Sequence, residues 1–106
     1  EERFSLNHFV SLISANPAKL MGLYPQKGAL AVGSDADVVI IDPQKKKEVD
    51  WQELATNCDW SPFQGMELAG FAETTLSRGK VVVKDGAFVG NQGHGKFVKR
   101  QAWGEV

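Results

Sequence analysis

The chain has 106 residues, enough for one modest domain and too few for a large enzyme with a deep pocket of its own. Twelve basic and thirteen acidic side chains leave a formal charge of −1, so no overall field favours nucleic acid or an anionic membrane surface. The longest apolar run, Val38 to Ile41, is far short of a membrane span, and no basic-then-apolar leader is present. We therefore expect a cytoplasmic protein with neither a nucleic-acid nor a membrane partner.

A helical period opens the chain. Ser5 is placed to cap the start, and one apolar stripe is formed by Leu6, Val10 and Ile13. The stretch "NPAKLMGL" predicts a second short helix, with Asn16 as its N-cap and Pro17 at the first helical position. Gly22 is suited to end that helix. The pattern predicts two helices within a helical segment over residues 1–23.

The pattern changes at "ADVVIID", where a β-branched run predicts a buried strand around Val38 to Ile41 that ends at Pro43. Lys45 to Lys47 form a small basic run that is typical of a solvated edge. Residues 51–70 lack a clear period and predict an irregular connection whose aromatic side chains pack inward, namely Trp51, Trp60 and Phe63. Cys58 is the single cysteine, which excludes an intrachain disulfide and favours a small buried or half-buried apolar role.

Two turn signals divide the next stretch, at Arg78-Gly79 and at Asp85-Gly86. Asp-Gly between β-rich runs is a strong signal for a two-residue hairpin, so we expect an antiparallel meander. After Gly90 the apolar density falls, and the glycines predict an extended tail. This tail carries three apolar side chains that favour docking onto another surface, Phe97, Val98 and Trp103.

Catalytic patterns are weak in this sequence. The two histidines, His8 and His94, stand at opposite ends of the chain, which does not favour a metal site. The glycines of "KGALAVGSDADVVIID" precede a strand and not a helix, which argues against a phosphate loop. We instead expect Gly33 to take a positive φ in a tight turn, with an aspartate side chain bonding back to the chain. Asp35 and Asp37 are two residues apart, a spacing typical of turns before strands. We predict no catalytic, cofactor-binding or metal-binding residue in this chain.

The stretch "SANPAKLMGLYPQKGALAVGSDADVVIIDP" resembles the end of the metal-dependent amidohydrolase superfamily. The later stretch "SPFQGMELAGFAETTLSRGKVVVKDGAFVGNQGHGKFVKR" resembles its cyclic-amidase branch, and "GHGKF" is most similar to dihydropyrimidinases and D-hydantoinases. Allantoinases and dihydroorotases share the first stretch but generally lack the long "GHGKF" tail. The resemblance covers nearly the whole chain, from about Phe4 to Trp103.

The resemblance implies an α+β fragment of a protein about four times as long. Residues 1–26 would be helices from the end of a (β/α)₈ barrel, residues 27–90 the C-terminal part of a small antiparallel β-sandwich, and residues 91–106 an extended tail. The barrel, absent here, would hold two zinc ions bridged by a carboxylated lysine. Metal-bound hydroxide would there attack the ring carbonyl of a dihydropyrimidine or hydantoin, while a barrel aspartate shuttles the proton. The fragment alone would be inactive.

The resemblance also implies partners. Sandwich strands without their mates would leave apolar faces open, so the partners would be the chain's own barrel and remaining strands. The family's tails reach neighbouring subunits in homotetramers, which suggests a role in subunit contact for Phe97, Val98 and Trp103. The alternative is a non-catalytic scaffold of the collapsin-response mediator type, from which this sequence differs at "NPAK" and at His94.

Overall fold

A computed structural model describes residues 4–102 of the chain. The chain begins with a continuous helical segment made of α1 (Leu6–Val10), a π-helical turn (Ser11–Ala15) and α2 (Asn16–Leu20). The Ser5 side chain accepts the amide of His8 at 3.2 Å, which confirms the predicted cap. The helical segment ends at Gly22, as predicted, where φ is +68°.

The predicted break between two helices is wrong. Asn16 has helical backbone angles of −66° and −47°, and its amide donates to the carbonyl of Ser11. Because an N-cap residue has non-helical backbone angles, Asn16 lies inside the helical segment and does not cap a new helix. Pro17, which has no amide hydrogen to contribute, follows within the same helical segment. One helix therefore replaces the expected pair.

A four-stranded antiparallel sheet follows, in the order β1-β2-β3-β4. Its strands are β1 (Val38–Glu48), β2 (Glu67–Ser77), β3 (Lys80–Lys84) and β4 (Ala87–Phe88). Both predicted hairpin turns are present: Arg78 and Gly79 have φ of +47° and +76°, and Asp85 and Gly86 have φ of +51° and +79°. Positive φ at both central residues is the geometry that matches the twist of tightly paired strands. The α+β class and the meander are as expected.

Strand β1 does not end at Pro43, contrary to prediction. Its pairing with β2 is interrupted between Asp42, opposite Phe71, and Lys46, opposite Ala69. Residues 43–45 therefore bulge out against a single residue of β2, Gly70, whose φ is +89°. The bulge accommodates a proline that has no amide hydrogen for the ladder, and pairing then resumes as far as Glu48.

Little of this chain is buried by the chain itself. Among the described residues, the buried hydrophobic side chains are Ala18 and Val49. The strand residues predicted to be buried are about half exposed, at 53% for Val39, 49% for Ile40 and 47% for Ile41. Local sequence identifies a strand with an apolar face, but burial of that face requires a second layer. None of the described elements provides it.

The connection between β1 and β2 holds one short 3₁₀ turn, Trp51–Glu53, and is otherwise irregular, as expected. Its aromatic residues do not all pack inward, however. Trp51 is half-buried, but Trp60 and Phe63 are 64% and 56% exposed. Cys58 is also exposed, so the buried role predicted for it is wrong within this chain. These side chains have no surface within the described chain against which they could pack.

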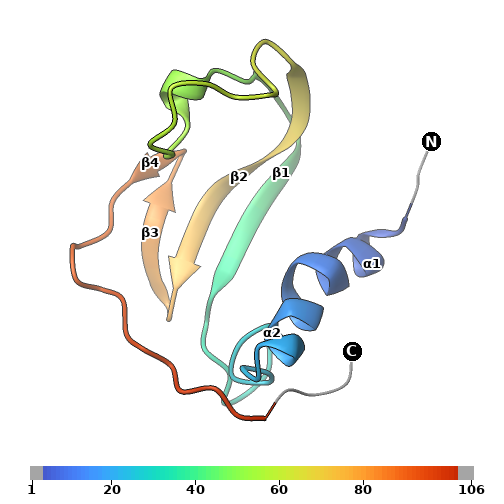
Figure 1. The fold of residues 1–106 in the computed structure, drawn as a ribbon, viewed down its shortest axis with the longest axis vertical. Coiled ribbons are helices and arrows are strands. Elements are labelled where there is room, and N and C mark those ends of the chain that lie inside the picture. Colours follow the sequence, from blue (N-terminus) through green and yellow to red (C-terminus); the bar gives the residue numbers. More distant parts are fainter. Residues whose placement is uncertain (1–3, 103–106) are drawn as a thin grey trace.

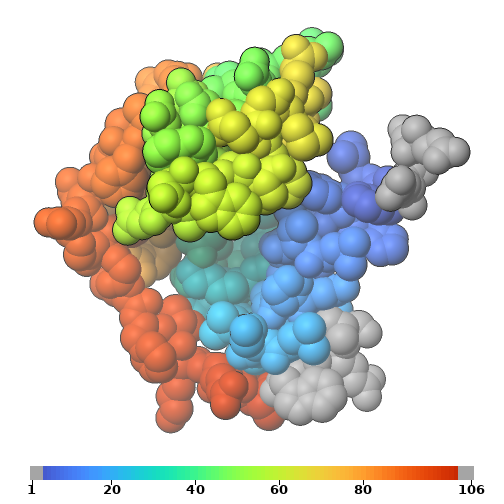
Figure 2. All heavy atoms as spheres, turned by 45° about the horizontal axis from the view of Figure 1, so that its top comes forward, coloured from blue at the N-terminus to red at the C-terminus, as the bar shows by residue number. Residues whose placement is uncertain are grey.

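The helical segment and the sheet lie apart. No Cα of the helical segment comes within 8 Å of a Cα in the described strands. Figure 1 shows the helices beside β1, while the tail descends past β3 and then runs below α2. In the space-filling view of Figure 2, strand β1 lies recessed between the helical segment and the β1–β2 connection. The backbone of the helical segment and the backbone of the sheet are thus not in close contact.

Two global measures quantify this openness. The Cα radius of gyration is 15.7 Å, whereas a compact domain of this length has a radius of about 13 Å. The accessible surface is 8911 Å², against about 5,800 Å² for a compact monomer of 11.6 kDa. The excess of about 3,000 Å² exceeds what one partner loses in a standard protein–protein interface, about 800 Å². The chain exposes surface on the scale of an obligate interface or of an opened domain core.

Candidate functional site

The polar residues of the loop before β1 form a compact charged cluster. Lys27 Nζ lies 2.9 Å from Asp35 Oδ2 and also contacts Asp37 Oδ2. Gln26 Nε2 donates to Asp35 Oδ2 at 3.2 Å, and the amide of Arg78 donates to Asp37 Oδ1 at 2.8 Å. The cluster joins the loop to the tip of the β2–β3 hairpin, 41 positions further along the chain.

The cluster fixes the charge of its members. The hydrogen bond to Asp37 raises the pKa of Lys27 against the opposing effect of desolvation. The hydrogen bond from Lys27 lowers the pKa of Asp35. For Asp37, desolvation would raise the pKa, but the hydrogen bonds from Lys27 and from the Arg78 amide together lower it. Both carboxylates are therefore ionised and paired near neutral pH, which suits a structural tie better than proton transfer.

The predicted turn is present, with one difference. Gly33 has φ of +92° and residues 31–34 form the turn. Ser34 Oγ donates to the carbonyl of Pro25 at 2.7 Å, and the Asp35 amide donates to the carbonyl of Gln26 at 2.8 Å. The Asp35 carboxylate binds side chains from earlier in the loop, and Asp37 is the aspartate that bonds back to a backbone amide. Sequence reasoning missed this long-range bond.

The two histidines lie in different environments. His8 is exposed on α1, while the His94 ring lies in the tail beside the β2–β3 hairpin. Nε2 of His94 lies 3.2 Å from the carbonyl oxygen of Ser77 and 3.1 Å from its Oγ. Within residues 4–102, no three His, Cys, Asp or Glu side chains gather in a way that could hold a metal ion. The residues present do not fit a two-metal centre.

The predicted contact residues of the tail differ in exposure. Phe97 is 93% exposed, whereas Val98 is half-buried. Trp103 lies outside the described residues. The tail has no regular structure, as predicted, but its Gln101 amide donates to the carbonyl of Gly22 at 2.8 Å. The tail therefore contacts the end of the helical segment.

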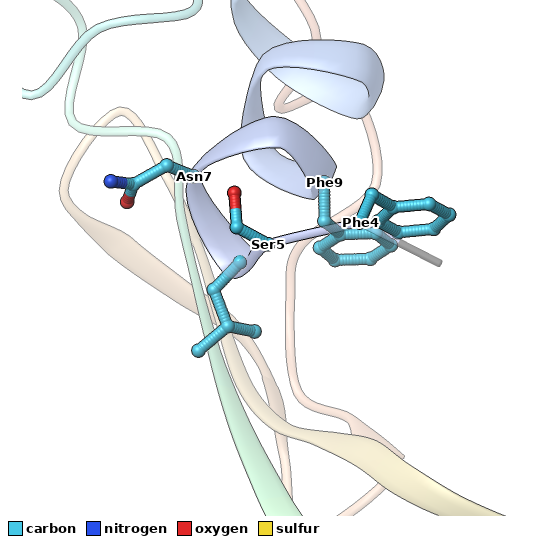
Figure 3. A pocket seen from close by; sticks show the side chains of 5 residues that line it. Phe4, Ser5, Asn7 and Phe9 are labelled. Carbon is cyan, nitrogen blue, oxygen red and sulfur yellow. The ribbon is translucent and has the colours of Figure 1, made fainter. Parts of the chain in front are cut away.

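Hollows on the surface are open and shallow. One hollow is lined by residues that are close in sequence at the start of α1, namely Phe4, Ser5, Leu6, Asn7 and Phe9. Figure 3 shows the rings of Phe4 and Phe9 lying over one another, and their centroids are 6.3 Å apart with an interplanar angle of 1°. Because all of its walls come from a single turn of chain, this hollow is no enclosed site for a substrate.

The most extensive candidate feature is thus the open apolar surface. On the helical segment it includes Leu12, Ile13, Leu20 and Met21, and on the sheet Val39, Ile40, Ile41 and Val81. Apolar area on this scale marks a surface that another body covers. No described helix is long and apolar enough to cross a membrane.

Comparison with known proteins identifies the family. The amidohydrolase family profile matches residues 1–82. D-phenylhydantoinase of Escherichia coli O1:K1 / APEC is 50% identical over 99 residues, which cover 93% of this chain and 22% of that protein. The crystal structure of D-hydantoinase from Bacillus sp. AR9 matches with a TM-score of 0.94 at 46% identity, over 99% of this chain and 23% of that one.

A dihydropyrimidinase from Brevibacillus agri NCHU1002 matches equally well, with a TM-score of 0.94 at 43% identity over 99% of this chain and 23% of its own. The chain therefore spans about a fifth of the length of the relatives it matches. Since the family profile covers more than half of the chain and structures over 40% identical share its fold, the chain belongs to the amidohydrolase family.

Proposed function

We propose that this chain is the non-catalytic part of a larger hydrolase that opens cyclic amide rings, with dihydropyrimidines or hydantoins as substrates. Two observations together support the proposal. The relatives are hydantoinases and dihydropyrimidinases. The chain also exposes about 3,000 Å² more surface than a compact monomer of its mass would. A chain that supplies only part of a fold is expected to expose such a surface.

In this proposal the chain has three parts. Residues 1–26 complete a (β/α)₈ barrel, residues 27–90 complete one sheet of a β-sandwich, and residues 91–106 form the tail. The absence of close backbone contact between the helical segment and the sheet supports this division, because the two parts would then belong to different layers. Lys27 and Asp35 lie at the start of the second part, and the bond from Gln26 to Asp35 ties that start to the end of the first part.

Two zinc ions bridged by a carboxylated lysine belong to the remainder of the protein in this proposal. The described residues of this chain do not fit such a centre, so no step of the reaction is assigned to them. Their contribution is to support the barrel from outside. The alternative of a non-catalytic scaffold is less well supported, because the relatives compared above are named as ring-opening enzymes.

The test uses the full-length protein and the 106-residue chain side by side. Ring opening of hydantoin and of 5,6-dihydrouracil is followed by the loss of ultraviolet absorbance. We expect turnover by the full-length protein, loss of turnover after chelation, and recovery with zinc. We expect no turnover by the chain alone, with or without zinc. Zinc-dependent turnover by the chain alone would refute the assignment, and a zinc-loaded full-length protein without turnover would favour the scaffold.

We further propose that the protein is a cytoplasmic homotetramer in which Phe97, Val98 and Trp103 contact a neighbouring subunit. An exposed phenylalanine on a tail anchored to its own chain supports this role for Phe97. Replacement of Phe97 by Ser is expected to lower the assembly mass measured by light scattering. The variant Phe88→Ser is a matched control, since Phe88 is 72% exposed but lies on β4. A tetramer that survives Phe97→Ser unchanged would argue against the contact.

A further inference from the structure

The tail is irregular, yet it is fixed at two separate points. The first is the tip of the β2–β3 hairpin, where Arg78 Nη2 donates to the carbonyl of His94 and the His94 ring reaches Ser77. The second is the end of the helical segment, where Gln101 binds Gly22. The path of the tail between these points is therefore set by bonds to two different elements.

The first anchor is built from well-placed groups. A backbone carbonyl can only accept, so the bond between His94 Nε2 and the Ser77 carbonyl requires a proton on Nε2. Ser77, Arg78 and His94 are all half-buried, which reduces competition from water. The anchor thus combines a bond from the Arg78 guanidinium to the tail with contacts from the His94 ring to the carbonyl and the hydroxyl of Ser77.

The hairpin tip is itself held in place. The amide of Arg78 is bound by Asp37, whose carboxylate also pairs with Lys27. Arg78 takes a φ of +47°, a conformation uncommon for a residue other than glycine, and its side chain reaches the tail. Arg78 therefore contacts the charged cluster through its backbone amide and the tail through its side chain.

Between the two anchors lies an outward-facing segment, residues 95–100. It carries the exposed Phe97 together with three exposed cations, Lys96, Lys99 and Arg100. An unanchored tail would spread these side chains over many positions, at an entropic cost to any binding event. Anchoring at both ends limits that freedom before a partner arrives.

We propose that Ser77, Arg78 and His94 form a latch that holds the tail on the β2–β3 hairpin and so positions residues 95–100. Ser77, Arg78 and His94 act as positioning residues, with no part in ring opening. The proposal concerns the path of the tail within one chain, so it stands or falls independently of the proposed activity and of the proposed tetramer.

The test measures amide hydrogen exchange of residues 91–102 in the full-length protein, together with trypsin cleavage at Lys96, Lys99 and Arg100. The variant His94→Ala removes the bond to Ser77, and we expect about 10-fold faster exchange of the two hydrogen-bonded tail amides, those of residues 94 and 101, and faster tryptic cleavage in this segment. His94→Gln retains a side-chain N–H donor, and it should restore most of the protection. His8→Ala is the matched control, because His8 is an exposed histidine on α1, and should leave the tail unchanged.

A second variant guards against a general folding defect. Arg78→Gly removes the guanidinium but suits the positive φ, so the hairpin and its backbone bond to Asp37 should persist. We expect faster exchange in the tail and unchanged exchange in β2 and β3. Unchanged tail exchange in both His94→Ala and Arg78→Gly would overturn the latch. So would a failure of His94→Gln to restore protection.

Discussion

The carboxylate of Asp37 accepts the backbone amide of Arg78 at 2.8 Å, which ties the loop before β1 to the turn between β2 and β3. Asp37→Ala should lower the free energy of unfolding by about 1.5 kcal/mol, the low end of the range for a hydrogen bond to a charged group. The ion pair with Lys27 adds little, because the Asp37 side chain is 40% exposed and solvent screens it. Urea unfolding of the full-length protein provides the measurement.

Asp35→Ala is the matched control for that substitution. Within residues 4–102, the Asp35 carboxylate binds only the side chains of Lys27 and Gln26, so its loss leaves no backbone amide there without a partner. We expect the Asp35 variant to be more stable than the Asp37 variant. Equal stability of the two variants would show that the hydrogen bond from the Arg78 amide adds nothing to the free energy of unfolding.

The same cluster predicts an acid sensitivity. Because the folded-state pKa of Asp37 lies below its ordinary value of 3.8, the stability it contributes is present above that pH and is lost as the pH falls further. Lys27 behaves in the opposite sense, since its pKa is raised above 10.5 and its contribution disappears only at higher pH. The difference in unfolding free energy between wild type and Asp37→Asn should be constant from about pH 5 to 9 and shrink below pH 3.8. A difference that grew on acidification would contradict the pairing.

The turn between β3 and β4 offers a test of backbone conformation. Asp85 has a φ of +51°, which aspartate, asparagine and glycine accept but β-branched residues resist. Asp85→Val should cost about 1–2 kcal/mol of stability, while Asp85→Asn should be nearly neutral. Thermal unfolding of the two variants separates them. A neutral Asp85→Val would mean that this turn is not held in the left-handed conformation.

Gly22 combines a positive φ with a close neighbour. A Cβ at this position would lie 2.1 Å from the carbonyl oxygen of Gln101, so Gly22→Ala should displace the tail as well as strain the backbone. Gly86→Ala isolates the strain alone, because Gly86 has a φ of +79° and a Cβ added there would meet no atom within 4 Å. We expect Gly22→Ala to speed tryptic cleavage at Lys99 and Arg100 and Gly86→Ala to leave the cleavage rate unchanged. Similar cleavage of both variants would show that Gln101 does not hold the tail.

The open apolar surface predicts that the 106-residue chain alone will associate. Exposed strand residues such as Ile40 have no covering layer in the described part of this chain, and hydrophobic burial is available only through another molecule. We expect light scattering to report species larger than a monomer at micromolar concentration. Ile40→Lys should reduce the association. A monomer mass at high concentration would contradict this expectation.

Sequence reasoning succeeded where the determinants are local. The cap at Ser5, the helix end at Gly22 and the turn at Asp85-Gly86 each depend on a few neighbouring residues, and all three are present. It failed where the outcome depends on what lies across space. Whether Ile40 or Trp60 is buried is decided by a partner layer, which the local pattern does not encode.

The charged cluster shows the same division. The turn around Gly33 was predictable, but the bond from Asp37 to Arg78 joins residues 41 positions apart. The local sequence shows only that Lys27 stands ten residues before Asp37, which immediately precedes a strand. This arrangement is too common to predict a specific ion pair. At Pro43, conversely, proline does not end the strand, because a bulge opposite Gly70 lets the pairing resume.

The bulge in β1 also bears on how copies of this chain can meet. Strand β1 is an outer strand of the described sheet, and its second half carries Pro43 and the lysines at positions 45–47. This half of the strand is a poor template for backbone pairing with a strand of another molecule, because its proline has no amide hydrogen and its lysines repel like charges. Backbone pairing between copies of this chain is therefore disfavoured along the second half of β1, so association there should proceed through side chains on the faces of the sheet.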